Sequence, residues 1–333
     1  MALGETAAAF AIALLLTPAL REAARRGGLL DRPNERSSHQ GVVPRGGGAA
    51  ILAATLAGLG LGRAAWSGAP GAAALVAGGV LLALVGLWDD RRGLSPFVRL
   101  AAQVAVAGIV VSVTGGIERL PLPVPLDVPL GPAGGVAAVV WIVGVVNFFN
   151  FLDGIDGIAT VQATVTAAGI ALAGWDPFSA LAGAVLAGAA AGFLPYNWSP
   201  ASVFLGDVGS YFLGYTLAAL PLAAPPGSRS PAVLFVALSL WLFLADAAWT
   251  LARRAARGAR WYEAHREHLY QQLAPRAGHA RVAAAIGLGS VALTAGALAA
   301  RSSGEPAWTW AVLGLALSLF AAEWALARVE RAA

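Results

Sequence analysis

The 333-residue sequence contains no cysteine, no lysine and few charged residues. The absence of cysteine excludes a disulfide framework and any metal site built on thiolates. The absence of lysine means that all 22 basic residues are arginines, which give a formal net charge of +4. Charged residues make up 12% of the chain, about half of the roughly 25% found in soluble domains. A chain of this length with so few charges cannot cover a water-facing surface.

Hydrophobic residues take the place of the missing charges, at 58% of the chain with a mean hydropathy of +0.70. Backbone groups in lipid must be paired within helices or a closed barrel. The long Ala/Leu/Val/Gly stretches lack the period-two alternation of barrel strands. The sequence therefore predicts an all-α polytopic membrane protein with one integral membrane domain over residues 1–333. A location in the bilayer explains the net positive charge better than binding to nucleic acid does.

Eleven apolar stretches are candidates for membrane-spanning helices, for which about 20 residues are needed. They lie at about 7–20, 46–62, 70–88, 98–114, 136–151, 157–174, 178–195, 209–224, 231–250, 280–300 and 307–326. The chain begins with an acidic residue, Glu5, and has no basic stretch before the first apolar segment. We therefore expect that segment to be retained rather than cleaved as a signal peptide.

The arginines separate the two sides of the membrane. Eighteen of the 22 fall on one side of these stretches, and Arg63, Arg119, Arg229 and Arg301 fall on the other. Since arginine marks cytoplasmic loops, we expect the N-terminus outside and the C-terminus in the cytoplasm. The expected cytoplasmic loops are about 21–45, 89–97, 152–156, 196–208 and 251–279. All four histidines and the carboxylates of the motifs below lie on this side, which predicts that the chemistry takes place there.

Three motifs place carboxylates at this face. In 88–92 (WDDRR), the adjacent Asp89 and Asp90 are costly beside lipid unless they are paired, hydrated or bound to a cation. The alternative is a solvated helix end neutralised by the two arginines that follow. In 204–210 (FLGDVGS), Asp207 at a helix start could hold Mg²⁺ while neighbouring N–H groups face a phosphate. The alternative there is an ordinary helix N-cap.

The third of these motifs, 147–157 (NFFNFLDGIDG), combines amides with carboxylates. Asn147, Asn150 and Asp153 recur every three residues, which places them near one face of a helix end, and Asp156 follows between glycines. A polar turn between two spans is the alternative. Asparagines inside a spanning helix argue against it, because amides in hydrocarbon need partners.

Two arginine-rich loops supply cationic groups. In 265–268 (HREH), His265 and His268 fit a diphosphate better than zinc, since neither a thiolate nor a third nearby histidine is present. His279 is expected to be incidental. The segments 31–39 (DRPNERSSH) and 44–48 (PRGGG) suit contact with a phosphate or lipid head group; the alternative is a simple positive-inside loop. Its candidate binding residues are Arg36, His39 and Arg45. Carboxylates, arginines and glycines on one face together indicate phosphoryl transfer.

Five motifs in this order resemble the polyprenyl-phosphate N-acetylhexosamine-1-phosphate transferases of glycosyltransferase family 4, over residues about 31–273. They are DRPNERSSH…VPRGGG, WDD, NFFNFLDGIDG, FLGDVGS and the HxxH loop. The resemblance implies Mg²⁺, for which Mn²⁺ can substitute, and a bacterial inner-membrane location. It also implies a UDP-amino sugar and undecaprenyl phosphate as substrates, with UMP as the product that leaves. Members of the family resemble dimers, which leaves a homodimer open.

The same resemblance implies roles for individual residues. Asp207 would be the principal Mg²⁺ ligand, and Asp153 and Asp156 would be nucleotide and metal-site residues. Asp89 and Asp90 would position or deprotonate the lipid phosphate. His265 and His268 would contact the substrate diphosphate, with Asn147 and Asn150 also at the substrate. Asp246, inside the ninth apolar stretch, matches an aspartate frequent in the family and is an intramembrane carboxylate.

Alternative functions stay open at this stage. The loop reads HREH rather than three consecutive histidines, which favours the O-antigen, capsule or teichoic-type branch over a phospho-MurNAc-pentapeptide translocase. A CDP-alcohol phosphotransferase would need an arginine soon after Asp156-Gly157, and this chain has none there. A secondary transporter would place its polar residues near the midplane, often in repeats. No repeat is visible here.

Overall fold

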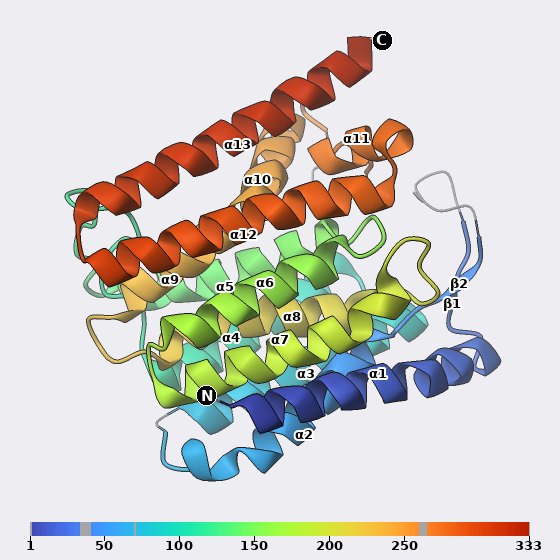
Figure 1. Ribbon diagram of the computed structural model, residues 1–333, viewed down its shortest axis with the longest axis horizontal. Helices are drawn as coiled ribbons and strands as arrows, with labels where there is room; N and C mark the ends of the chain where they lie inside the picture. The colour runs from blue at the N-terminus through green and yellow to red at the C-terminus, as the bar shows by residue number, and fades with distance from the viewer. Residues whose placement is uncertain (1, 34–40, 70, 260–264, 333) are drawn as a thin grey trace.

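Helices account for most of the structure, a computed structural model that describes residues 2–33, 41–69, 71–259 and 265–332 (Figure 1). The helices are α1 (Leu3–Arg26), α2 (Gly48–Leu61), α3 (Ala72–Arg92), α4 (Pro96–Thr114), α5 (Ala133–Phe151), α6 (Ile158–Ala173), α7 (Pro177–Asn197), α8 (Gly206–Ala219), α9 (Arg229–Ser239), α10 (Trp241–Ala256), α11 (Leu269–Ala277), α12 (His279–Ser303) and α13 (Pro306–Ala332). Short elements complete it: strands β1 (Leu30–Asp31) and β2 (Val43–Pro44), and 3-10 turns η1 (Arg63–Ala65) and η2 (Leu220–Ala223).

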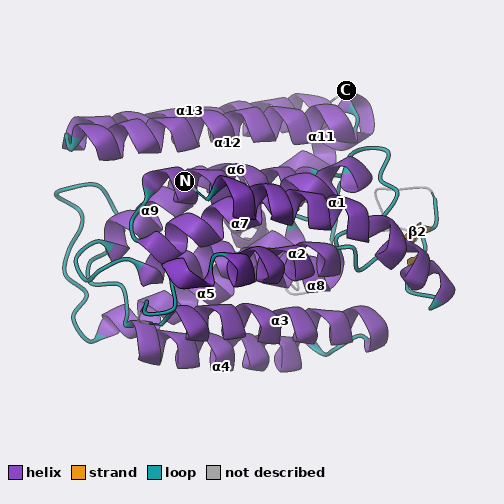
Figure 2. Ribbon diagram, turned by 60° about the horizontal axis from the view of Figure 1, so that its bottom comes forward, coloured by secondary structure: helices purple, strands orange, loops and turns teal. Residues whose placement is uncertain are grey.

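The long helices run side by side, so that the molecule has two ends (Figure 1). α7 packs against α1 and α6, and α8 packs against α3 and α5. The hairpin α12–α13 forms an outer layer on one side, and α3 and α4 form the layer on the other (Figure 2). Because α8 is enclosed, residues at its start are positioned by helices from distant parts of the chain.

The prediction of an all-α polytopic membrane protein is confirmed. Within the described part of the chain, seven helices are long and apolar enough to cross a bilayer, or eight if α9 and α10 form one bent span. α2 and α6 are apolar but shorter. Each of the eleven apolar stretches overlaps a helix or, at 231–250, the α9–α10 pair. That pair bends by 78°, and the loop expected at 251–279 contains α11; the sequence predicted neither feature.

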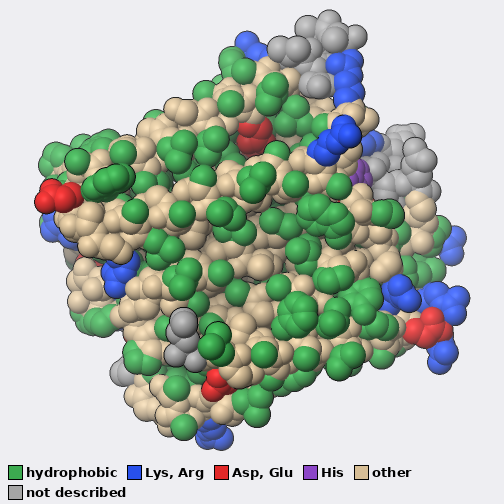
Figure 3. Space-filling view, in the orientation of Figure 1, with side chains coloured by type: hydrophobic (Ala, Val, Ile, Leu, Met, Phe, Trp, Pro, Cys, Tyr) green, Lys and Arg blue, Asp and Glu red, His purple; other side chains and the backbone are tan. Residues whose placement is uncertain are grey.

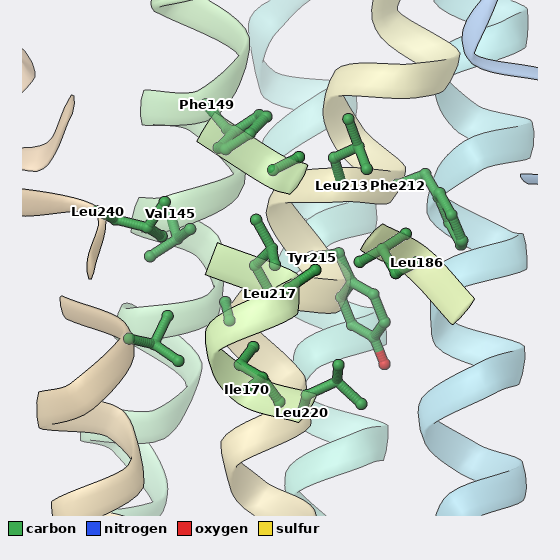
Figure 4. Packing of buried hydrophobic residues seen from close by; sticks show 14 of the residues in the cluster. Val145, Phe149, Ile170, Leu186, Phe212, Leu213, Tyr215, Leu217, Leu220 and Leu240 are labelled. Atoms are coloured by element: carbon green, nitrogen blue, oxygen red, sulfur yellow. The ribbon is translucent and has the colours of Figure 1, made fainter. Parts of the chain in front are cut away.

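The core is built around α8, whose side chains interdigitate with those of α5, α6 and α7 (Figure 4). Tyr215 is 1% exposed, and its hydroxyl donates to the carbonyl of Leu75 in α3 at 3.1 Å. A Cβ on Gly78 would lie 2.1 Å from that hydroxyl. α3 therefore approaches α8 closely only because Gly78 has no side chain, which is the usual way for membrane helices to gain packing contacts.

Arginine side chains gather at the end of the bundle where β1, β2 and α11 lie, while the flank is mostly apolar side chains and backbone (Figure 3). β1 and β2 pair antiparallel, with Leu30 opposite Pro44. Beyond β2 the backbone joins α8: the Phe204 N–H donates to the Pro44 carbonyl at 2.8 Å, and the Gly48 N–H donates to the Leu205 carbonyl at 2.9 Å. The basic loop is thereby fixed to the start of α8.

Candidate active site

The start of α8 is held by a carboxylate from α3. Asp90 is 2% exposed. It accepts from the backbone N–H groups of Asp207 and Val208, both at 3.1 Å. Unpaired N–H groups at a helix start carry partial positive charge, so a buried carboxylate is stable there. The expectation that N–H groups beside Asp207 face a phosphate is therefore wrong for these two, because Asp90 already uses them.

Three groups surround the neighbouring carboxylate, Asp89. Its Oδ1 accepts from the Leu94 N–H at 2.7 Å. Its Oδ2 accepts from the Tyr211 hydroxyl at 2.9 Å and from Arg99 at 3.2 Å. Asp89 thus ties α3 to α4 and α8. The arginine that neutralises Asp89 is Arg99 on the next helix. Arg91 and Arg92, which the alternative interpretation put in that role, make no contact with Asp89 among the described residues.

One of the two asparagines of α5 forms a hydrogen bond with Asp207. Asn150 Nδ2 donates to Asp207 Oδ1 at 2.7 Å and to Ser210 Oγ at 3.0 Å. Asn147 instead donates to Gln103 Oε1 in α4 at 2.6 Å and to a carbonyl of its own helix. The structure therefore brings Asn150 to the carboxylates, whereas Asn147 cross-links α4 and α5.

The carboxylate of Asp153, in the loop between α5 and α6, has neither a hydrogen-bond donor nor an ion-pair partner among the residues that the structure describes. Withdrawal from water, and then the charges of Asp207, Asp90 and Asp156, raise the pKa of Asp153 to about 8. Such a shift marks a carboxyl whose negative charge is not balanced by its neighbours. Groups of this kind concentrate at functional sites.

Asp156 differs from Asp153 in having partners. Its Oδ2 accepts from the Ala201 N–H at 3.2 Å and lies 3.4 Å from His279 Nδ1. Burial acts to raise the pKa of Asp156, but hydrogen bonds with His279 and the Ala201 N–H outweigh it and lower the pKa below its usual value. His279, expected to be incidental, is thus placed against a predicted site residue.

Glycines set the spacing of this end of the bundle. Gly206 has φ +73°, and a Cβ there would lie 2.8 Å from Asp90 Oδ2. A Cβ on Gly48 would lie 2.2 Å from the Gly209 Cα. Arg45, which directly precedes the glycines at 46–48, donates from Nη2 to the Asp90 carbonyl, and its Nε lies 3.8 Å from Asp90 Oδ1.

Two predicted binding residues of the same basic loop, Arg36 and His39, lie outside the residues that the structure describes.

Asp246 in α10 anchors the histidine loop. It is 1% exposed and accepts from the Leu269 N–H at 2.9 Å and the Tyr270 N–H at 3.3 Å, the first residues of α11. His268 Nδ1 lies 3.4 Å from Asp246 Oδ1, and its ring centroid is 4.8 Å from that of His265. Asp246 therefore positions the histidine loop. None of these contacts joins Asp246 to the carboxylates around the start of α8.

His265 is uncharged at neutral pH. Burial, and then the charges of His268 and Arg254, lower the pKa of His265 to about 4. A neutral imidazole still donates one hydrogen bond. His265 can therefore hold a phosphate oxygen by hydrogen bonding but not by charge.

Several functional candidates were not found from the sequence. Arg99 and Tyr211 hold Asp89, and Glu267 accepts from arginines at the end of α10, including Arg257 at 2.6 Å. A signal was present for Tyr211, which directly follows the FLGDVGS motif. Glu323 in α13 is 8% exposed, and neither of its carboxyl oxygens has a partner within the described residues. No motif surrounds Glu323, but it lies inside the apolar stretch 307–326, and a carboxylate within a spanning segment is a signal that could have found it.

The donors available for a metal ion are carboxylates. Among the described residues, no three His, Asp or Glu side chains converge closely enough to hold a metal unaided. Mg²⁺ commonly binds through one or two carboxylates and completes its shell with water and substrate phosphates. Within the described ranges, the Asp153 carboxylate has no partner and Asp207 accepts a hydrogen bond on Oδ1 only. The charge of Asp207 acts on Asp153, so this pair fits such a site.

Fold and site together define a multi-pass membrane protein with clustered carboxylates at one end of its helix bundle. The model of glycosyl transferase family 4 matches residues 72–224. This range contains Asp89, Asp90, Asp153, Asp156 and Asp207. Three relatives are similar over longer stretches. A decaprenyl-phosphate N-acetylglucosaminephosphotransferase of Mycobacterium tuberculosis is 32% identical over 298 residues, covering 79% of this chain and 73% of the relative.

An undecaprenyl-phosphate alpha-N-acetylglucosaminyl 1-phosphate transferase of Escherichia coli is 31% identical over 312 residues, covering 89% of this chain and 83% of the relative. A Bacillus subtilis protein described as a probable undecaprenyl-phosphate N-acetylglucosaminyl 1-phosphate transferase is 29% identical over 215 residues, covering 63% of this chain and 59% of the relative. The chain therefore belongs to the polyprenyl-phosphate N-acetylhexosamine-1-phosphate transferases of glycosyl transferase family 4.

Proposed function

We propose that this protein transfers an N-acetylhexosamine-1-phosphate from a UDP-sugar to undecaprenyl phosphate. An oxygen of the lipid phosphate attacks the β-phosphorus of the nucleotide sugar, and the bond from that phosphorus to the bridging oxygen breaks. UMP leaves, and the lipid diphosphate carries the sugar with its anomeric bond intact. The observation that carries the proposal is the junction of Asp90, Asp207 and Asn150 with the unpaired Asp153 beside it.

The residues proposed to hold Mg²⁺ are Asp207 and Asp153. When bound, Mg²⁺ would neutralise charge on the diphosphate as the phosphoryl group moves. Asp156 was the other ligand expected from the sequence. Unlike Asp153, Asp156 has its charge balanced by the Ala201 N–H and His279, so we propose that Asp156 shapes the loop that presents Asp153.

Asp89 and Asp90 are proposed to position the acceptor phosphate rather than to deprotonate it. Both carboxylates already accept hydrogen bonds, three at Asp89 and two at Asp90. A phosphate monoester has a second pKa of about 6, so at neutral pH it is mostly dianionic without a base. Arg45 and Arg99, held by these aspartates, supply positive charge for a phosphate arriving from the bilayer.

The donor is proposed to lie between this centre and the histidine loop. The rings of His265 and His268 lie 4.8 Å apart in a tilted arrangement, and Asp246 holds the loop through the start of α11. Tyr270, at the start of α11, also donates to the Phe151 carbonyl at 3.3 Å. The histidine loop is therefore tied to the segment that carries Asp153. The motif HREH, in place of three consecutive histidines, supports a branch other than the peptidoglycan translocase.

The membrane arrangement is proposed on the same basis. The eleven apolar stretches would each cross the bilayer of the bacterial inner membrane, with the N-terminus outside and the C-terminus in the cytoplasm. Support comes from the arginines, 18 of which share one side. The carboxylate centre lies at that end, where a soluble UDP-amino sugar would reach it. A homodimer is proposed from family resemblance only.

The test is transfer of labelled sugar to lipid. Membranes containing the protein are incubated with Mg²⁺, undecaprenyl phosphate and radiolabelled UDP-GlcNAc, UDP-GalNAc or 6-deoxy analogues. We expect lipid-extractable label with one UMP released per sugar transferred. No lipid-linked label with any donor would sink the proposal. Release of UDP instead of UMP would show cleavage at the anomeric carbon and would also exclude it.

A dependence on pH and Mg²⁺ follows from Asp153. Because the pKa of Asp153 is raised to about 8, its carboxyl is neutral below that pH and ionised above it. A metal binds the ionised form and competes with the proton. We expect the Mg²⁺ concentration for half-maximal transfer to fall about tenfold per pH unit between about pH 6 and 8, and then to level off. An Asp153→Asn variant should lose this slope, and a Mg²⁺ requirement independent of pH in the unmodified protein would contradict the assignment.

A further inference from the structure

A pocket lies at the end of the bundle away from the carboxylates. It has a volume of about 480 Å³. Its walls come from the 119–127 segment after α4, from Trp175 between α6 and α7, from α9, and from the turn between α12 and α13. These loops gather at the end opposite β1 and β2 (Figure 1). Nothing in the proposed transfer reaction uses this pocket.

The pocket walls are fixed by contacts between distant segments. The Arg119 N–H donates to Ser230 Oγ at 2.9 Å, and Arg119 Nε pairs with Asp127 Oδ2 at 2.8 Å. Trp310 Nε1 donates to the Val124 carbonyl at 2.9 Å, which ties α13 to the same segment. The pocket is therefore preformed, as binding sites usually are.

Two donors at the pocket have unused capacity. Trp175 Nε1 is buried and has no acceptor within the described residues. The Arg301 guanidinium stacks over the Trp175 ring at 3.5 Å from its centroid, and Arg301 Nε donates to the Ala173 carbonyl at 2.9 Å. No carboxylate in the described part of the chain forms an ion pair with Arg301, since Asp127 is paired with Arg119 and Glu305 is exposed. A buried donor without an acceptor is costly, so an acceptor is expected here.

Most of the remaining lining is apolar, and its polar side chains are those of Glu305 and Thr309. Leu234, Phe235 and Leu238 face the pocket from α9, and Ala297 and Ala300 face it from α12. Four of these five are buried within the protein, at 8% exposure or less. Donors at one end and an apolar wall along membrane helices fit an amphiphile with an anionic head group, not a free ion.

We propose that this pocket binds a phosphate-bearing lipid from the leaflet at the arginine-poor end. Arg301 and Trp175 donate to the phosphate, and the hydrocarbon chain lies along α9 beside Leu234 and Leu238. A guanidinium suits a phosphate because its N–H groups form parallel, charge-assisted hydrogen bonds. A phosphate oxygen of the head group supplies the acceptor that Trp175 Nε1 lacks among the described residues.

Native mass spectrometry of the delipidated, detergent-purified protein tests this proposal. The probes are phosphatidylglycerol, undecaprenyl phosphate, diacylglycerol and inorganic phosphate. Trp175→Phe removes one N–H and keeps the ring, so we expect about fivefold weaker binding of phosphatidylglycerol; Arg301→Gln should weaken it at least about tenfold. Arg63→Gln, at the same end but outside the pocket, should bind as the unmodified protein does.

The probes also separate the possible sources of the phosphate. If undecaprenyl phosphate is the resident lipid, the two pocket variants lose one of two bound molecules, and the other stays at the transfer site. Unchanged phosphatidylglycerol and undecaprenyl phosphate binding in both variants would overturn the proposal. Diacylglycerol bound as tightly as phosphatidylglycerol would show that no phosphate is recognised, and tight binding of inorganic phosphate alone would show that no lipid is. Melting temperatures check folding, and Trp175→Phe decides the matter if Arg301→Gln does not fold.

Discussion

Replacing Asp207 with asparagine is expected to reduce sugar-1-phosphate transfer about 1,000-fold or more. A metal ion contributes several kcal/mol to charge stabilisation in such reactions, and each 1.4 kcal/mol is about tenfold in rate. Asn150 holds Asp207 Oδ1 at 2.7 Å, so the asparagine keeps one acceptor oxygen for that contact. Its other oxygen becomes an uncharged NH₂ group, which cannot bind a metal ion. The measurement is lipid-linked label formed per minute at saturating Mg²⁺.

A control separates loss of the metal ligand from a general effect of lost charge. Glu22 is at the same end of the bundle, where it pairs with Arg25 and Arg26. Glu22→Gln should leave transfer unchanged. Near-normal turnover in Asp207→Asn, at a Mg²⁺ concentration that saturates the unmodified protein, would refute the metal assignment.

Replacing Asp90 with asparagine is expected to lower both stability and turnover. The amide would turn an N–H₂ group toward one of the two backbone N–H groups that Asp90 now accepts. Leaving a buried donor unpaired costs about 1–3 kcal/mol. Because the same change shifts Asp207 relative to Arg45, we expect transfer to fall about 100-fold, in line with the sensitivity of reacting groups to misplacement.

The chain offers a matched control in Asp176, which caps α7 at the far end of the bundle. Asp176 Oδ1 accepts from the Phe178 N–H at 2.9 Å and the Ser179 N–H at 3.0 Å. Asp176→Ala removes this cap, at a cost of about 0.5–2 kcal/mol, and should lower the melting temperature without slowing transfer. If the two variants lose stability equally and both keep normal turnover, Asp90 is a structural cap and nothing more.

The helices were largely predictable because lipid demands long apolar segments. The stretches at 98–114 and 136–151 correspond to α4 (Pro96–Thr114) and α5 (Ala133–Phe151). The break between α9 and α10 was not predictable, since Ser239, Leu240 and Trp241 include neither proline nor glycine. It is set by packing, and packing is not visible in a single sequence.

The candidate site shows a similar division. Asp90 and Asp207 were singled out by their motifs, but that Asp90 caps the helix beginning at Asp207 depends on how α3 and α8 meet. The case of Asn147 and Asn150 is instructive. Three residues in a helix turn the chain by about 300°, so the two side chains point about 60° apart. That angle suffices to direct Asn150 to α8 and Asn147 to α4.

The joint between the basic loop and the start of α8 has a consequence for sequence variation. It is made by backbone groups of Pro44, Gly48, Phe204 and Leu205, so it does not depend on which side chains these positions carry. Only the glycines are fixed, by lack of room, since Gly48 and Gly209 lie in contact. Side chains at 41–44 can therefore vary while the start of α8 stays in place, whereas Arg45 is held by its contacts with Asp90.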